Sequence, residues 1–281
     1  MSLKPSNPNP RSAHRARKRF GQHFLHDAGV IARIIDAIDP SADERHLEIG
    51  PGLGALTLPL LQRIGHLEVI EIDRDVIPIL QSSAKPLGDL IVHEANALKV
   101  DLLALHAGAA PFRVCGNLPY NISTPLLFHF LAARSVITDM HFMLQREVVA
   151  RMAALPDTAD YGRLTVMLAA HCTVEWLFDV GPGSFRPPPR VHSSIVRLVP
   201  HTEAPFAVPD PARFAAVVAA AFSQRRKTLR NSVAGLISPA AFEITGIDPK
   251  RRAETLSPSE FADLAATPSP LYFDPNALET V

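Results

Sequence analysis

Cysteine, aromatic residues and long apolar runs are scarce in this chain of 281 residues. Its two cysteines, Cys115 and Cys172, lie far apart and lack metal-ligand spacing, which argues against a disulfide framework or a zinc site and indicates a reducing compartment. The longest apolar run, residues 214–222, is too short to cross a bilayer, and no apolar signal segment follows the basic start. We therefore expect a cytoplasmic protein with no membrane association and no metal ion.

An excess of charge of either sign is also lacking, since the formal net charge is zero. The charges are nevertheless unevenly spread, because no acidic residue precedes Asp27. Local basic patches on a neutral chain suit contact with a nucleic-acid backbone, although each patch taken alone is equally well a solvated face. The basic clusters are Arg17, Lys18 and Arg19 in the tail, Arg225, Arg226, Lys227 and Arg230, and Lys250, Arg251 and Arg252.

Apolar residues make up 47% of the chain, enough for a substantial core. Residues 1–19 form a Pro-containing basic tail that we expect to be disordered. A helix from about Asp27, its expected N-cap, opens a domain spanning 20–200. Alternating elements then predict a doubly wound α/β sheet of parallel strands. The expected strands are 46–50, 67–72, 90–93, 112–116 and 139–145, and the expected helices are 55–64, 74–83, 123–133 and 146–155.

The pattern changes after residue 161. A helix over 163–171 is followed by strands over 172–180 and 192–199, which we expect to pair as a hairpin at the sheet edge. The Pro-rich segment 181–190 between them, which carries Arg186 and Arg190, is either a binding wall or a stiff connector. A linker over 201–210 leads to a smaller helical domain over 211–281, with expected helices at 211–222, 226–236, 239–245 and 258–266.

A glycine-rich turn organises the first domain. Gly50, Gly52 and Gly54 alternate between an apolar strand and an apolar helix, which permits a tight turn and close approach of a ligand to the backbone. Glu71, about twenty residues further on, is placed to accept hydrogen bonds from both ribose hydroxyls. This arrangement predicts a nucleotide-type ligand, and a nicotinamide cofactor and S-adenosylmethionine both satisfy it.

A second motif, Asn117-Leu118-Pro119-Tyr120, follows the fourth strand. Methyl transfer to an adenine amine needs acceptors for both N–H bonds, because they draw the nitrogen toward tetrahedral geometry. The Asn117 side-chain oxygen and the Leu118 carbonyl are candidate acceptors. Pro119 stiffens the turn, and Tyr120 offers a face on which the base stacks.

The motif is also compatible with an ordinary turn before a helix. Placed after a glycine turn and Glu71, however, it favours S-adenosylmethionine, because a dehydrogenase has no evident use for it.

With these motifs the chain resembles the KsgA-type small-subunit ribosomal RNA adenine dimethyltransferases over nearly its whole length. The likeness rests on residues 17–25, 47–54, 117–120, 185–191 and 221–229. It implies a class I methyltransferase that dimethylates two adjacent adenines near the 3′ end of 16S RNA within an assembling small subunit, and we expect a monomer. It places His23, Leu25, Gly50, Gly52, Glu71, Asn96 and Asn117 at the methyl donor. It also suggests RNA contacts by the basic tail, Arg186, Arg190 and residues 225–227.

The chain departs from the family pattern at two positions, since the family usually has Asn where His23 stands and Asp where Asn96 stands. Asn96 keeps an acceptor oxygen but not the charge. His23 contacts the methyl donor, contacts the RNA, or only stabilises the loop in which it lies. Three rival interpretations remain: a large-subunit RNA adenine methyltransferase of the macrolide-resistance type, a non-catalytic RNA-binding assembly factor, and a Rossmann dehydrogenase. Against the first of these, the Pro-rich stretch 185–191 and the basic stretch within 221–229 favour the small subunit.

Overall fold

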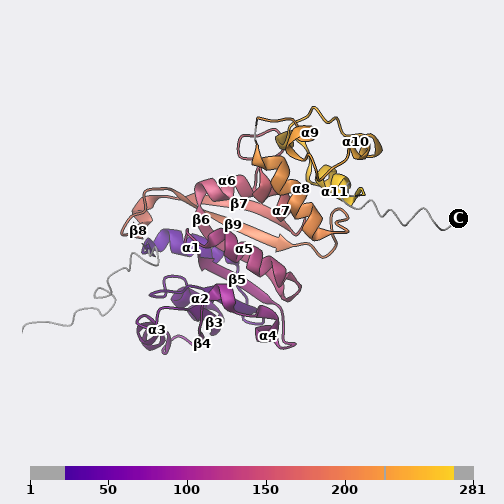
Figure 1. Cartoon of the computed structure of the whole chain (residues 1–281). Coiled ribbons are helices and arrows are strands. Elements are labelled where there is room, and N and C mark those ends of the chain that lie inside the picture. Colours follow the sequence, from indigo (N-terminus) through magenta and orange to yellow (C-terminus); the bar gives the residue numbers. More distant parts are fainter. Residues whose placement is uncertain (1–22, 225, 269–281) are drawn as a thin grey trace, which may run out of the picture. The chain divides into compact units, whose positions relative to one another are not determined.

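The computed structural model describes residues 23–224 and 226–268 (Figure 1). The chain divides into two compact units. The first takes the residues up to Val149 and Glu175–Pro200, and the second takes Ala150–Val174 and the residues from His201 on. The division differs from the predicted domains at 150–174, because these residues, including the helix α7 (Arg163–Ala169), pack with the helical unit.

The first unit is built around a seven-stranded sheet, whose strands lie in the order β4-β3-β2-β5-β6-β9-β7. The strands β2 to β6 are parallel, as predicted, and β9 runs antiparallel to β6. The strand order reverses between β2 and β5, and ligands of doubly wound sheets bind at such a reversal. The bounds are β2 Arg45–Ile49, β3 His66–Glu71, β4 Asp89–Glu94, β5 Phe112–Asn117, β6 Ile137–Gln145, β7 Cys172–Val180 and β9 Ser193–Pro200.

The predicted edge hairpin is confirmed, because β9 and β7 are neighbours and β7 lies at the edge. The sequence did not predict a small sheet of β1 (Phe24–Leu25) and β8 (Phe185–Arg186), which pair antiparallel. The N–H of His26 also donates to the carbonyl of Ser184 at 2.9 Å. The start of the described chain is thereby joined to the Pro-rich segment.

Helices link the parallel strands. Asp27 caps α1 as predicted, since its carboxylate accepts from the N–H groups of Gly29 and Val30. Apolar residues of α1, α2 and α3 share one core with β3, in which Ile34, Leu60 and Val69 are almost fully buried. The helices are α1 Ala28–Ile38, α2 Thr57–Ile64, α3 Ile77–Ala84, α4 Leu102–His106, α5 Ser123–Ala132 and α6 Arg146–Met152.

The second unit has its own core around Phe214, Val218 and Phe261. Its helices include α8 (Pro211–Ser223), α10 (Pro239–Thr245) and α11 (Pro258–Ala266), each with proline in the first turn as predicted. The predicted helix over 226–236 is wrong except for α9 (Leu229–Ser232). There the N–H of Leu229 donates to Arg251 and that of Arg230 to Pro249, so these groups bond another segment rather than a preceding helical turn.

Candidate functional site

A cavity of about 1140 Å³ opens at the carboxyl ends of the parallel strands, within the first unit. The glycine turn, the ends of β3 and β5, and the loop after β4 line it together with His23, Leu25, Arg186 and Pro187. Residues far apart in sequence therefore meet around one space, as the strand-end positions predicted. The predicted site residues that line it are His23, Leu25, Gly50, Gly52, Glu71, Asn96, Asn117, Leu118, Pro119 and Tyr120.

The glycine turn has the backbone that its sequence requires. Gly50 and Gly52 have φ of 66° and 53°, where side chains with a Cβ are rare. The N–H of Gly52 donates to Oε2 of Glu71 at 3.1 Å, so the turn and the end of β3 are tied together.

Glu71 is only 6% exposed yet lines the cavity. Its Oε1 accepts from the N–H groups of Ile72 and Asp73, both at 2.8 Å. Burial raises the pKa of Glu71, and these backbone donors oppose the rise. The fixed carboxylate can accept hydroxyl donors from a ligand.

Glu48 is a second buried carboxyl group beside the glycine turn, and its sequence pattern indicates only a strand residue. It is 2% exposed, and the Thr57 hydroxyl donates to its Oε2 at 2.6 Å. Burial raises the pKa of Glu48 to about 8, so the group is protonated near neutral pH.

This burial predicts a pH-dependent stability. Because the folded pKa lies above the ordinary value, the stabilising contribution of Glu48 is complete at acid pH and declines as the pH rises toward about 8. The Glu48→Gln variant cannot titrate at this position. As the pH rises over that range, the free energy of unfolding of the wild type should therefore fall relative to that of the variant, by at most about 1.4 kcal/mol per pH unit. Urea denaturation at several pH values measures the difference. A constant difference would mean that Glu48 is ionised in the folded protein.

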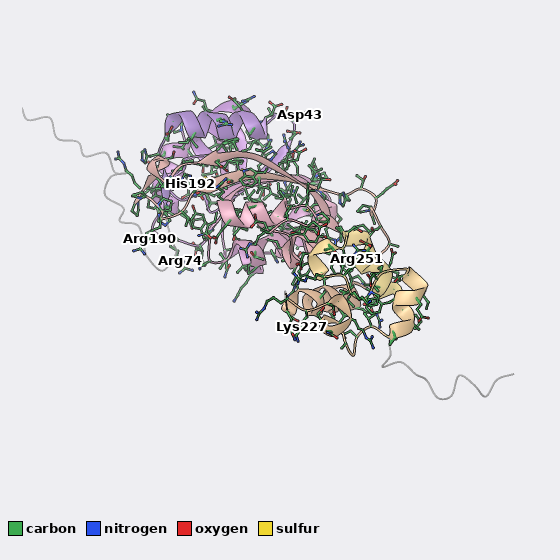
Figure 2. The ribbon with its side chains drawn as sticks, turned by 90° about the horizontal axis from the view of Figure 1, so that it is seen from above. Asp43, Arg74, Arg190, His192, Lys227 and Arg251 are labelled. Carbon is green, nitrogen blue, oxygen red and sulfur yellow. The ribbon has the colours of Figure 1, made fainter. Side chains whose placement is uncertain are left out.

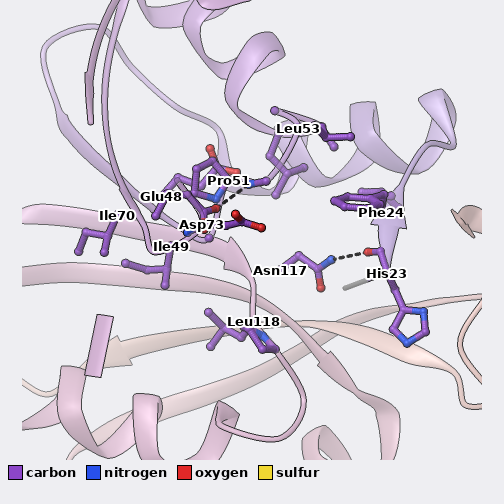
Figure 3. A pocket seen from close by; sticks show the side chains of 18 of the residues that line it. His23, Phe24, Glu48, Ile49, Pro51, Leu53, Ile70, Asp73, Asn117 and Leu118 are labelled. Atoms are coloured by element: carbon purple, nitrogen blue, oxygen red, sulfur yellow. Dashed lines mark hydrogen bonds between the residues drawn. The ribbon is translucent and has the colours of Figure 1, made fainter. Parts of the chain in front are cut away.

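Asn117 ends β5 and faces the cavity (Figure 3). Its Nδ2 donates to the carbonyl of His23 at 3.3 Å, and only the amide nitrogen can make that bond. Its Oδ1 is therefore turned the other way, as an acceptor. The residue before it, Gly116, lets β5 lie close to the end of β2, because a Cβ there would lie 2.5 Å from the carbonyl oxygen of Ile49.

Tyr120 lies half-buried in the loop between β5 and α5. Its hydroxyl is 2.7 Å from the hydroxyl of Ser193. Burial raises the pKa of Tyr120, so the phenol stays protonated. The ring of His23 is nearly parallel to that of Tyr120, with centroids 6.1 Å apart, and His23 Nδ1 lies 2.8 Å from the carbonyl of Pro187.

Asn96 follows β4 and lines the cavity, with its Oδ1 accepting from the N–H of Leu98 at 3.0 Å. It caps the short 3₁₀ turn Ala97–Lys99. Its side chain is thereby held at the cavity wall by a bond that an aspartate can also make.

The predicted RNA-contacting residues are only partly described. Arg17, Lys18, Arg19 and Arg225 lie outside the described residues. Arg186 and Arg190 are exposed on the Pro-rich segment of the first unit, and Arg226 and Lys227 are exposed in the second unit (Figure 2 labels Arg190 and Lys227). Arg251 differs, because it bonds the carbonyl of Thr255 and the carboxylate of Glu260 and is tied within its own unit.

Within 23–224 and 226–268, no cluster of at least three histidine, cysteine or acidic residues could hold a metal ion. In the same part of the chain, no helix is long and apolar enough to span a bilayer.

Solved structures place the fold in a class. The structure is similar to a dimethyladenosine transferase from Plasmodium falciparum, with a TM-score of 0.74 and 26% identity over 86% of this chain and 96% of that chain. It is also similar to the 23S rRNA methyltransferase ErmE, with a TM-score of 0.67 and 26% identity over 86% and 98%. The fold is that of a class I, Rossmann-like methyltransferase.

Sequence relatives identify the family within the class I methyltransferases. The family model for ribosomal RNA adenine dimethylases matches residues 13–267. The ribosomal RNA small subunit methyltransferase A of Pseudomonas putida is 53% identical over 257 residues, covering 92% of this chain and 96% of the relative. That of Thiobacillus denitrificans is 53% identical over 253 residues, covering 90% and 98%. The chain belongs to the ribosomal RNA adenine dimethylase family.

Proposed function

We propose that this protein transfers methyl groups from S-adenosylmethionine to the exocyclic amines of two adjacent adenines near the 3′ end of 16S RNA. Its substrate is the RNA within an assembling small subunit, and it acts as a cytoplasmic monomer. The observation that carries the proposal is that the glycine turn, Glu71, Asn96 and Asn117 line one cavity. Identity of 53% to small-subunit methyltransferases supports the choice of RNA.

The cavity suits the methyl donor. Gly50 and Gly52 let a ligand approach the backbone, and the buried Glu71 carboxylate is placed to accept from ribose hydroxyls. His23 and Leu25 also line the cavity. S-adenosylmethionine supplies a methyl group bound to a positively charged sulfur. The sulfur is the leaving group and keeps the electron pair of the sulfur–carbon bond.

Asn117 and Leu118 orient the acceptor amine. The adenine nitrogen donates its N–H bonds to Asn117 Oδ1 and the Leu118 carbonyl, which localises its lone pair for attack on the methyl carbon. A nitrogen–carbon bond forms as the sulfur–carbon bond breaks, and the amine then loses a proton to solvent. Pro119 stiffens this turn, and Tyr120 stacks on the base. No side chain needs to act as a general base, because the amine becomes acidic only after methylation.

Asn96 provides a test of the donor site. Asn96→Asp restores a charged acceptor for the adenine amine of the donor and should tighten its binding by ~1 kcal/mol, about fivefold in Kd. Calorimetric titration with S-adenosylmethionine measures the effect, with Asn231→Asp in the second unit as the charge control. Unchanged or weaker binding would remove Asn96 from the donor site.

The basic residues provide a test of RNA contact. Replacing Arg225, Arg226 and Lys227 by glutamine should weaken subunit binding and lower the slope of log K against log salt by up to about 2–3. Filter binding at several salt concentrations measures the slope. Arg74→Gln with Lys85→Gln, two exposed cations of the first unit, serve as the control. An unaltered slope in the triple variant would make the cluster a solvated face only.

One experiment separates the proposal from its rivals. Radiolabelled S-adenosylmethionine is incubated with the protein and either immature small subunits or large-subunit RNA. We expect label in the small subunits alone. Label in large-subunit RNA would support the ErmE-like alternative, and binding without label would support a non-catalytic assembly factor.

A further inference from the structure

The hydroxyl of Ser193 has one hydrogen-bond partner among the described residues, the hydroxyl of Tyr120 at 2.7 Å. Ser193 is 0% exposed, although it lies at the first position of β9. Its backbone is held in the sheet, opposite Gln145 of β6. A buried hydroxyl on a paired strand is a rigid anchor, because its backbone is held by the sheet and water cannot replace its hydrogen-bond partner.

Tyr120 needs such an anchor. It lies in the loop between β5 and α5, where its carbonyl accepts from the Ser123 hydroxyl at 3.2 Å. That contact fixes the backbone and leaves the ring direction open. The bond from the phenol tip to β9 fixes the far end of the side chain, so the long axis of the ring is held at both ends.

The anchored ring is connected to Asn117. Tyr120 lies beside the ring of His23, and His23 accepts at its backbone carbonyl from Asn117 Nδ2. His23 is itself held at its Nδ1 by the carbonyl of Pro187. The stacking face of Tyr120 and the acceptor oxygen of Asn117 are therefore set relative to each other by contacts that include β9.

We infer that Ser193 is a positioning residue, which holds Tyr120 so that a stacked adenine presents its amine to Asn117. This inference rests on the proposed function. It assigns the Tyr120 hydroxyl to anchoring rather than to proton transfer. Ser193 contacts neither the donor nor the base, so its loss should lower kcat and leave donor binding intact.

A double-mutant cycle tests the inference. Ser193→Ala and Tyr120→Phe each remove the same hydrogen bond, and each should lower kcat about tenfold, the value of one neutral hydrogen bond. The double variant should lose no more than the poorer single variant, because the bond is already absent. The Kd for S-adenosylmethionine should stay within twofold in all three.

Ser194→Ala is the matched control. Ser194 is equally buried on the same strand, but its hydroxyl donates to Asp179 at 2.6 Å on the opposite face. It should keep the wild-type kcat even where its melting temperature falls. A kcat of Ser193→Ala within twofold of the wild type, additive losses in the double variant, or an equal loss in Ser194→Ala would each overturn the positioning role while leaving the proposed function intact. Wild-type protein without transferase activity would overturn both.

Discussion

Asn117→Ala should lower kcat for methyl transfer by about 10²–10³-fold, the range seen when one preorganised hydrogen-bond partner of a transition state is removed. The side chain lines the cavity with Oδ1 turned away from the His23 carbonyl, because Nδ2 occupies that carbonyl. Alanine removes the acceptor for the adenine amine and the tie to His23 together. Single-turnover methylation of small subunits measures the rate, and calorimetry shows whether donor binding survives.

Two variants sharpen this test. Gln81→Ala removes an exposed amide from α3 and should keep full activity. Asn117→Asp keeps an acceptor but sets a negative charge against the carbonyl of His23, so we expect no rescue. An active Asn117→Ala protein, or one whose loss is explained by lost donor binding alone, would exclude Asn117 from amine orientation.

Arg113→Met should cost about 3–5 kcal/mol of stability, because it removes the nearest cation from the buried carboxylate of Asp139, which keeps only the longer contact with Arg197 at 3.4 Å. Arg113 donates to Asp139 Oδ1 and Oδ2 at 3.0 and 2.9 Å, and Asp139 is 2% exposed. It also donates to the carbonyls of Ile38 and Asp39, at the carboxyl end of α1. Burial acts to raise the pKa of Asp139, but its bonds to Arg113 hold that pKa below the ordinary value.

Arg74→Met is the matched control, because Arg74 also pairs with a carboxylate, that of Glu94, but its side chain is 82% exposed. Exposed pairs contribute about 0–1 kcal/mol, so urea denaturation should separate the two variants clearly. Adding Asp139→Asn to Arg113→Met should recover part of the loss. Equal losses of unfolding free energy in Arg113→Met and Arg74→Met would show that the buried Arg113–Asp139 pair stabilises the fold no more than an exposed pair does.

The parallel sheet and the cavity residues could be predicted because their signals are local. Alternating elements fix the direction of the strands, and carboxyl ends of parallel strands meet at one edge. Gly50, Glu71 and Asn117 stand at such ends, and all line the cavity. The roles assigned to these residues stay predictions until the variants above are measured.

Features that depend on contacts distant in sequence could not be predicted. The two-residue strands β1 and β8 have no period to detect, yet they join the start of the domain to the Pro-rich segment. The basic run after α8 suggests a helix, but the N–H of Leu229 bonds to Arg251 instead. The ion pair of Arg113 and Asp139 could not be predicted either, since nothing in the sequence of one strand indicates its buried partner on the next strand.

The fold alone could not distinguish small-subunit RNA from large-subunit RNA as the substrate. The structure is similar both to a dimethyladenosine transferase and to the 23S rRNA methyltransferase ErmE. Both are similar to it over 86% of this chain, so the discrimination depends on sequence relatives and on the Pro-rich and basic segments. Two such stretches, residues 185–191 and 221–229, already favoured the small subunit from the sequence.

Mass spectrometry of small-subunit RNA from cells that lack this protein tests the central claim most directly. We expect two adjacent adenines near the 3′ end to be unmethylated, and to regain N6-dimethylation when the wild-type protein, but not Asn117→Ala, is supplied. Dimethylated adenines in the deleted cells, or full restoration by Asn117→Ala, would contradict the account.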